Sequence, residues 1–155
     1  MKPFILYYSR SGNTEKLAVK IKSSLGCNML KIEPEDEYGN YIASCLRVTK
    51  ERKNKVTPQF KTNIPDLSEY DVILLGYPVW AQDVPAFVAD FVLQCDLKGK
   101  TVIPFVTFGM SGVSWTMKTL RKICKNANIA YPYDYGVFKK DNYEKWIENV
   151  KGLLK

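Results

Sequence analysis

The 155-residue chain contains no histidine. Histidine is the commonest general base and metal ligand that proteins use near neutral pH. Its absence excludes hydrolytic triads that need an imidazole. If the chain supports catalysis, we therefore expect a bound cofactor to carry the chemistry.

The chain is also poor in cysteine motifs and in long apolar runs. Its cysteines are far apart and form no Cys-x-x-Cys pair, so we expect neither a disulfide framework nor a metal site. They are Cys27, Cys45, Cys95 and Cys124. No apolar run approaches the roughly 20 residues of a membrane span, and the start of the chain lacks a cleavable signal pattern. We expect one domain over residues 1–155, located in the cytoplasm.

Positive charge is in excess, with 23 Lys and Arg against 16 Asp and Glu and a net charge of +7. The densest basic cluster is Arg47, Lys50, Arg52, Lys53 and Lys55. No nucleic-acid-reading motif accompanies it. The pattern is more typical of a solvated helix end and loop than of a nucleic-acid patch, so we expect no nucleic-acid partner.

The most informative stretch is the polar loop Ser9–Thr14, with the sequence Ser-Arg-Ser-Gly-Asn-Thr. An apolar run, Phe4–Tyr8, leads into it, and an amphipathic stretch, residues 15–25, leads out. A buried strand, a polar loop with a glycine and a helix together form an anion site, because the first helical amides point at the ligand.

Ordinary helix capping explains the same residue types equally well. The loop lacks the Gly-Lys-Ser/Thr of a Walker loop, and it lacks the nucleophilic cysteine of a thiol phosphatase. The loop therefore has the groups to hold a phosphate and no evident means of transferring one.

Strand-like and helix-like patterns alternate five times along the chain. The expected strands are 3–8, 29–32, 71–76, 101–106 and a last, broken strand, 129–138, interrupted at Pro132. The expected helices are 12–25, 41–53, 85–95, a helix that ends near Lys125, and 142–154. This alternation predicts a parallel sheet with helices on both faces and a ligand site beyond the carboxyl ends of the strands.

Helical spacing also predicts which side chains pack inward. In the 41–53 helix we expect an inward face of four apolar residues. They are Tyr41, Ile42, Cys45 and Leu46. In the helix that ends near Lys125 we expect Val113, Met117, Leu120 and Cys124 to pack inward.

Tyr7–Thr14 resembles the phosphate loop of the flavodoxins. The resemblance extends to Gly76–Trp80 and to Thr107–Gly112, which are similar to two further flavin loops of a bacterial flavodoxin-like subgroup. Together with the element order, it covers nearly the whole chain. It implies a three-layer α/β sandwich with a five-stranded parallel sheet of order 2-1-3-4-5, the order of flavodoxin itself.

The resemblance implies FMN as the cofactor. Ser9, Ser11, Gly12, Asn13 and Thr14 would hold the FMN phosphate, and Arg10 stands at a variable position of that motif. The flavin ring would be lined by residues of the other two loops. They are Pro78, Val79, Trp80, Thr107, Phe108, Gly109, Ser111 and Gly112. We expect Trp80 to stack on the ring rather than to pack in the core.

Two departures from the electron-carrier flavodoxins concern function. The acidic, tyrosine-bearing third loop of those carriers is replaced by Phe108 and Met110, and the chain is basic where the carriers are acidic. Within the expected flavin loops, Asp83 is the only carboxylate and Arg10 the only cation. We therefore expect full reduction of the flavin to be easier than in an acidic carrier.

Three functions remain open. The first is an FMN electron-transfer protein or oxidoreductase with an unidentified redox partner. The second is an NAD(P)H-dependent reductase of a small quinone-like acceptor. The third is a non-catalytic module that binds a phosphate-bearing ligand.

Overall fold

The computed structural model describes residues 1–136 and 138–155. Parallel strands form a central sheet of order β2-β1-β3-β4-β5, with β6 also paired to β4. The strands are β1 (Pro3–Tyr7), β2 (Asn28–Lys31), β3 (Val72–Pro78), β4 (Thr101–Phe108), β5 (Asn128–Ile129) and β6 (Tyr133–Gly136). The helices are α1 (Asn13–Leu25), α2 (Tyr41–Lys53), α3 (Ala86–Gln94), α4 (Val113–Ile123) and α5 (Tyr143–Leu154). The predicted strand order and helix positions are confirmed.

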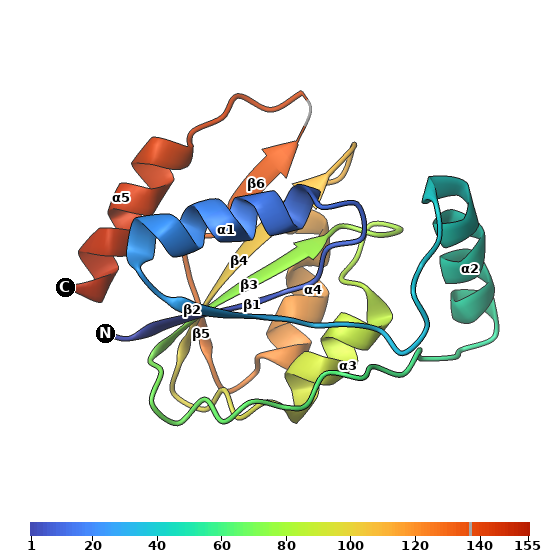
Figure 1. The fold of residues 1–155 in the computed structure, drawn as a ribbon, viewed down its shortest axis with the longest axis horizontal. Coiled ribbons are helices and arrows are strands. Elements are labelled where there is room, and N and C mark those ends of the chain that lie inside the picture. The colour runs from blue at the N-terminus through green and yellow to red at the C-terminus, as the bar shows by residue number, and fades with distance from the viewer. Residues whose placement is uncertain (137) are drawn as a thin grey trace.

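Helices cover both faces of the sheet (Figure 1). One apolar cluster joins the sheet to α3 and α4, and a second joins it to α1 and α5. The continuous apolar run of β3 is buried along six of its seven residues, as expected of a strand covered on both faces. This core holds the carboxyl ends of β1, β3 and β4 at one edge.

The last strand is broken, as predicted, and its two pieces both pair with β4. The break contains Pro132, which lacks an amide donor, and Tyr131, whose φ of 47° is left-handed. Of the predicted 129–138 strand, Val137 lies outside the described residues. None of the helices in the described ranges has the length and apolar character needed to cross a membrane.

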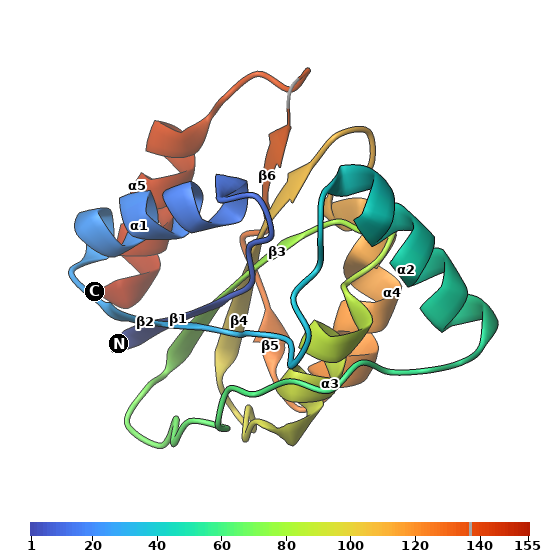
Figure 2. The same ribbon diagram turned by 45° about the vertical axis from the view of Figure 1, so that its right-hand side comes forward.

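The prediction for the inward face of α2 is wrong. Tyr41, Ile42, Cys45 and Leu46 are all exposed. The helix stands beside the loop end of the sheet rather than on one of its faces (Figures 1 and 2). Periodicity identifies an apolar face, but it does not say that the core covers this face. The prediction for α4 holds better, since Val113, Leu120 and Cys124 are buried and Met117 is half-buried.

Gly76 shows how tightly the sheet is packed where β3 approaches the loop edge. A Cβ at this position would lie 2.2 Å from the Phe105 ring on β4. Any larger residue must displace a ring that is itself fully buried.

We expect Gly76→Ala to lower the free energy of unfolding by about 1–3 kcal/mol, the usual cost of an overpacked core. Chemical denaturation measures the change. Gly152→Ala on α5 is the matched control, because its Cβ meets no atom within 4 Å and helix propensity favours alanine. If Gly76→Ala unfolds at the same denaturant concentration as the wild type, the close packing against Phe105 is contradicted.

Candidate functional site

Hydrogen bonds tie three loops together at the carboxyl edge of the sheet. The Thr14 and Thr107 hydroxyls lie 2.7 Å apart and both side chains are buried. The Val79 amide donates to the Thr107 carbonyl at 2.9 Å. We name the three loops the phosphate loop (Ser9–Thr14), the Trp80 loop (Tyr77–Val84) and the third loop (Thr107–Gly112). Thr107, the first residue of the third loop, therefore contacts both of the other loops.

Local geometry divides the phosphate loop into structural and exposed groups. Gly12 has a φ of 91°, a left-handed conformation that favours glycine. Its amide donates to the Ser9 hydroxyl oxygen at 3.1 Å. Ser9 and Thr14 are buried and shape the loop, whereas Ser11 and Asn13 are exposed. Two of the predicted phosphate ligands are thus open to a ligand through their side chains.

The N-terminus of α1 is open, in contrast to those of α2, α4 and α5. A side-chain oxygen accepts from an amide at each of those three helix starts, supplied by Asn40, Asp134 and Asp141. No side chain caps α1 within the described residues. The amides of Asn13 and Thr14 are therefore available to an anion beside the positive end of the helix dipole.

The charged side chains near the N-terminus of α1, Glu15 and Arg10, are both engaged by other groups. Glu15, in the first turn of α1, accepts from the Tyr7 hydroxyl at 2.8 Å and lies 3.8 Å from the Lys31 ammonium. Its carboxylate is thus engaged toward β1 and β2. Arg10 reaches across to the Gly39 carbonyl at 3.3 Å. The loop thus presents amides and hydroxyls, the donor set that phosphate oxygens need.

A tight turn carries Trp80. Trp80 and Asp83 exchange two backbone hydrogen bonds, and between them Ala81 and Gln82 have φ values of 46° and 64°. Left-handed conformations cost roughly 1–2 kcal/mol for each residue that has a Cβ. Arg52 on α2 donates to the Ala81 carbonyl at 3.0 Å and so supports the turn from one side.

Asp83 supports the same turn from the other side. One of its carboxylate oxygens accepts from the Val84 amide at 2.8 Å, and the other accepts from the Thr119 hydroxyl on α4 at 2.9 Å. Asp83, the carboxylate that we expected in a flavin loop, therefore stabilises this turn.

Trp80 is half-buried and belongs to an aromatic cluster. Its ring meets Tyr8 and Tyr38 edge-on, at centroid distances of 5.3 and 4.7 Å, and Phe87 packs against both tyrosines. The Tyr8 hydroxyl is the one buried side-chain polar atom without a partner among the described residues. Burial raises the pKa of Tyr8 well above its ordinary value, and Tyr38 adds to the shift.

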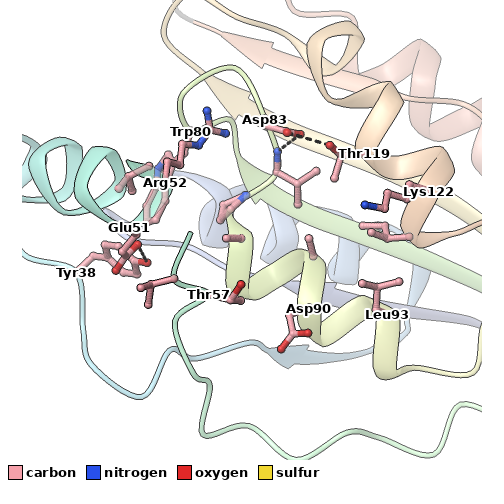
Figure 3. Close-up of a pocket in the computed structure, with 17 residues that line it drawn as sticks. Tyr38, Glu51, Arg52, Thr57, Trp80, Asp83, Asp90, Leu93, Thr119 and Lys122 are labelled. Carbon is pink, nitrogen blue, oxygen red and sulfur yellow. Dashed lines mark hydrogen bonds between the residues drawn. The ribbon is translucent and has the colours of Figure 1, made fainter. Parts of the chain in front are cut away.

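A cleft of about 320 Å³ lies beside Trp80, between α2, α3 and α4 (Figure 3). Small apolar residues of α3, including Ala86 and Ala89, line its floor. Arg52 and Lys122 line it from α2 and α4, respectively. Its volume is at the lower end of the range of small-molecule sites.

The third loop is held from the last strand. Phe108 packs across Gly136, where a Cβ would lie 2.4 Å from the ring. Asp134 accepts from the Val113 amide at 2.6 Å and pairs with the Lys139 ammonium at 2.6 Å. Gly109 is exposed and Ser111 and Gly112 are half-buried.

Sequence reasoning missed the groups that support the predicted site from outside its loops. Tyr38 and Arg52 come from the α2 region, and Asp134 comes from β6. Asp134 is a carboxylate on β6 next to the third loop, so an acid from outside the expected flavin loops also lies close to them. Only the fold brings these residues to the loops, and no local pattern marks them.

A family model and several solved structures match this chain, and they agree with one another. Residues 2–150 match a family model described as Flavodoxin. No curated protein sequence matches significantly. A protein from Bacteroides uniformis that is assigned as a flavoprotein is similar in structure, with 26% identity, 97% of each chain covered and a TM-score of 0.82.

Two more distant structures share the fold. A flavoprotein from Lactobacillus acidophilus, solved in complex with FMN, has 23% identity and a TM-score of 0.72, covering 86% of this chain and 91% of that one. The two-electron reduced flavodoxin of Megasphaera elsdenii has 22% identity and a TM-score of 0.60, covering 94% and 93%.

The buried hydroxyl pair generates a test of how the loops are joined. Thr14→Val should leave the Thr107 hydroxyl unpaired and lower the free energy of unfolding by about 1–3 kcal/mol. The double variant Thr14→Val/Thr107→Val should recover most of this loss, because two apolar groups of the same shape replace both partners. Chemical denaturation of both variants measures it, and strictly additive losses would contradict the pairing.

Proposed function

The chain belongs to the flavodoxin family, and we propose on this basis that it binds FMN and serves in electron transfer. The observation that carries the proposal is the open N-terminus of α1, which follows a polar loop at the carboxyl edge of the sheet. When bound, FMN supplies the redox chemistry, and the protein supplies binding, orientation and electrostatics.

The residues present fit the phosphate end of FMN. Ser9–Thr14 has no acidic residue, and Glu15 is engaged with Tyr7 and Lys31. The open α1 amides and the exposed Ser11 and Asn13 side chains would hold the phosphate, while Ser9, Gly12 and Thr14 keep the loop in shape.

The flavin ring would be lined by Pro78, Val79 and Trp80 on one side. Thr107, Phe108, Gly109, Ser111 and Gly112 would line the other side. Backbone bonding fixes the distance between these two loops, because Val79 pairs with Thr107 and Pro78 stands opposite it in the β3–β4 register. Apolar and aromatic groups of this kind exclude water from the ring.

The charge around these loops is close to balanced. Asp134 is paired with Lys139, whereas Asp83 accepts only from neutral donors, the Val84 amide and the Thr119 hydroxyl, and keeps its negative charge. A single carboxylate without a cation partner among the described residues of these loops would oppose negative charge on a reduced flavin less than several would. This supports easier full reduction than in an acidic carrier. The four free cysteines support a reducing, cytoplasmic location.

A second function, reduction of a small quinone-like acceptor, is favoured by one observation. The cleft beside Trp80 combines an apolar floor, which includes Ala86 and Ala89, with charged residues such as Arg52 and Lys122, and its volume of about 320 Å³ suits a small ligand. Oxidation of NADPH that depends on both FMN and an added quinone would establish this reductase. Without such turnover, electron transfer to a protein partner is favoured.

An absorbance spectrum of the purified protein with and without added FMN decides whether the chain is a flavoprotein. We expect flavin bands that shift when FMN binds. If the spectrum of added FMN is unchanged in the presence of the protein, the proposal fails and a module for another phosphate-bearing ligand remains.

Ser11→Glu tests the phosphate site. A carboxylate about 4 Å from the phosphate costs roughly 4 kcal/mol at a surface-like dielectric, so FMN affinity should fall by more than about a hundredfold. Fluorescence titration measures it. Ser23→Glu is the matched control, since it adds the same charge to the exposed distal part of α1, beyond the screening length of about 8–10 Å. Equal affinity in the two variants would refute the assignment.

Trp80→Ala tests the ring site. Loss of an aromatic contact should weaken FMN by about tenfold and restore part of the flavin fluorescence that is quenched on binding. Trp80→Phe keeps an aromatic face and should retain most of both effects. The circular dichroism spectrum of each variant should match that of the wild type, which would show that the fold tolerates the loss of contacts to Tyr8 and Tyr38. Unchanged quenching in the alanine variant would mean that Trp80 belongs to the core and does not contact the flavin.

A further inference from the structure

The exposed side of α4 carries a row of positive charges. Lys118, Arg121 and Lys122 are all exposed, and at 100° per residue they fall within one arc of the helix, opposite its buried residues. None of the three takes part in an ion pair among the residues that the structure describes. Trp115, which is 58% exposed, lies in the same arc. We name these four residues the basic face of α4.

No carboxylate of α4 balances these charges. The helix has no Asp or Glu, and none occurs between Asp96 and Asp134 in the sequence. The Asp134 carboxylate, at the start of α4, is already paired with a lysine. Asp83 and Asp90 line the cleft beside α4, but both are half-buried, and Asp83 accepts from the Thr119 hydroxyl. The basic face therefore presents net positive charge to its surroundings.

Helix stability explains only part of this pattern. Cations in the last turn interact favourably with the helix dipole, which accounts for Arg121 and Lys122. Lys118 lies one turn before Lys122, and like charges four residues apart destabilise a helix slightly. The exposed Trp115 adds nothing to the dipole interaction. Tryptophan and cations together on one exposed face are typical of a surface that binds another protein.

The basic face adjoins two of the three loops of the candidate site. The Trp115 amide donates to the Gly112 carbonyl, at the end of the third loop, at 3.2 Å. Thr119, one turn after Trp115, donates to Asp83 in the Trp80 loop at 2.9 Å. Met110, within the third loop, is 95% exposed. A molecule that covers Trp115 therefore lies beside both loops that are expected to line the flavin ring.

We propose that the basic face of α4, together with Met110, binds a redox protein whose surface is acidic around its own redox centre. This rests on the proposed electron-transfer function, which needs a partner within reach of the flavin. Charge complementarity selects the sign of the partner, because cations at an interface steer and orient an oppositely charged surface. Trp115 and Met110 supply the apolar contact at the end of the face nearest the flavin loops.

Nucleic acid and anionic lipid also carry negative charge. Neither gains from a position beside the flavin loops, whereas an electron-transfer partner needs that position. No nucleic-acid-reading motif accompanies α4 in the sequence. The location of the face therefore favours an acidic protein, and the other two become outcomes of the test.

Calorimetric titration of the FMN-supplemented protein with a [2Fe–2S] ferredoxin of net negative charge tests the face. Electron-transfer interfaces are small, so we expect weak binding that salt weakens further. At about 0.1 M salt, where the screening length is about 10 Å, Lys118→Glu/Arg121→Glu should raise the dissociation constant at least about tenfold. Lys22→Glu/Lys145→Glu is the matched control. It changes the net charge equally on α1 and α5, across the sheet from α4, and should leave binding unchanged.

Trp115→Gln separates the apolar contribution from the charge contribution. It should weaken ferredoxin binding about tenfold at low and at high salt, because the contact of a buried aromatic anchor is not screened. The effect of the Lys118/Arg121 variant should instead shrink as salt rises. Circular dichroism checks the fold of each variant. Lys118→Gln/Arg121→Gln adds no acid to the last turn of α4 and should also weaken binding, so it replaces the glutamate variant if that variant does not fold.

Three results would overturn the proposal. The first is no binding of the acidic ferredoxin, or equal binding of a cytochrome c of net positive charge. The second is an equal loss in the Lys118/Arg121 and Lys22/Lys145 variants. The third is tighter binding of a DNA duplex or of anionic lipid vesicles than of the ferredoxin at the same salt concentration.

The absorbance spectrum with FMN is recorded separately for every variant. Loss of ferredoxin binding with unchanged FMN binding assigns the effect to the basic face of α4. A wild-type chain that binds the ferredoxin through this face but shifts no flavin band contradicts the FMN proposal and leaves the docking surface standing. The failure of one proposal is therefore distinguishable from the failure of the other.

Discussion

The pairing of Thr14 with Thr107 is the interaction on which the geometry of the candidate site depends. Parallel register brings the ends of β1, β3 and β4 to one edge, but register alone does not fix the loops that follow. The buried hydroxyl pair joins the first turn of α1 to the end of β4, and the Thr107 carbonyl then receives the Val79 amide. Because both hydroxyls are buried, neither can exchange its partner for water without opening the loop.

The two sides of the site differ in how they are supported. The phosphate loop continues directly from a central strand into a helix packed on the sheet. The Trp80 turn instead contains two left-handed residues and depends on Arg52 and Asp83 for support. Strained turns of this kind persist only when their surroundings fix them. The phosphate side is therefore the rigid half of the site, and the Trp80 side depends on how α2 is placed.

Apolar runs and glycine-containing loops are local signals, so the sequence predicts the positions of the strands and helices well. The strand order followed from the resemblance to the flavodoxins and is confirmed. The candidate phosphate loop can also be recognised locally, since the strand, the polar loop and the helix are consecutive. Which residues of the loop would contact a phosphate is less predictable. Ser9 and Thr14 look like phosphate ligands in the sequence, yet in the structure their hydroxyls bond to Gly12 and Thr107.

Two features could not be read from the chain. The supports of the site, Tyr38, Arg52 and Asp134, come from segments far apart in sequence and meet the loops only through the fold. The orientation of α2 was predicted wrongly because a hydrophobic stripe shows amphipathicity without showing what covers it. The polar side of α2 is engaged by Gly39, Asn40 and Tyr38, a set of contacts without a periodic signature.

Helix α2 contacts both halves of the site. Arg10 of the phosphate loop donates to Gly39 just before α2, and Arg52 of α2 donates to Ala81 in the Trp80 turn. Both contacts are single hydrogen bonds to backbone carbonyls, so they hold only while α2 keeps its position. Helix α2 therefore stands between the two halves of the site, and the position of the turn that carries Trp80 depends on the position of Arg52 on this helix.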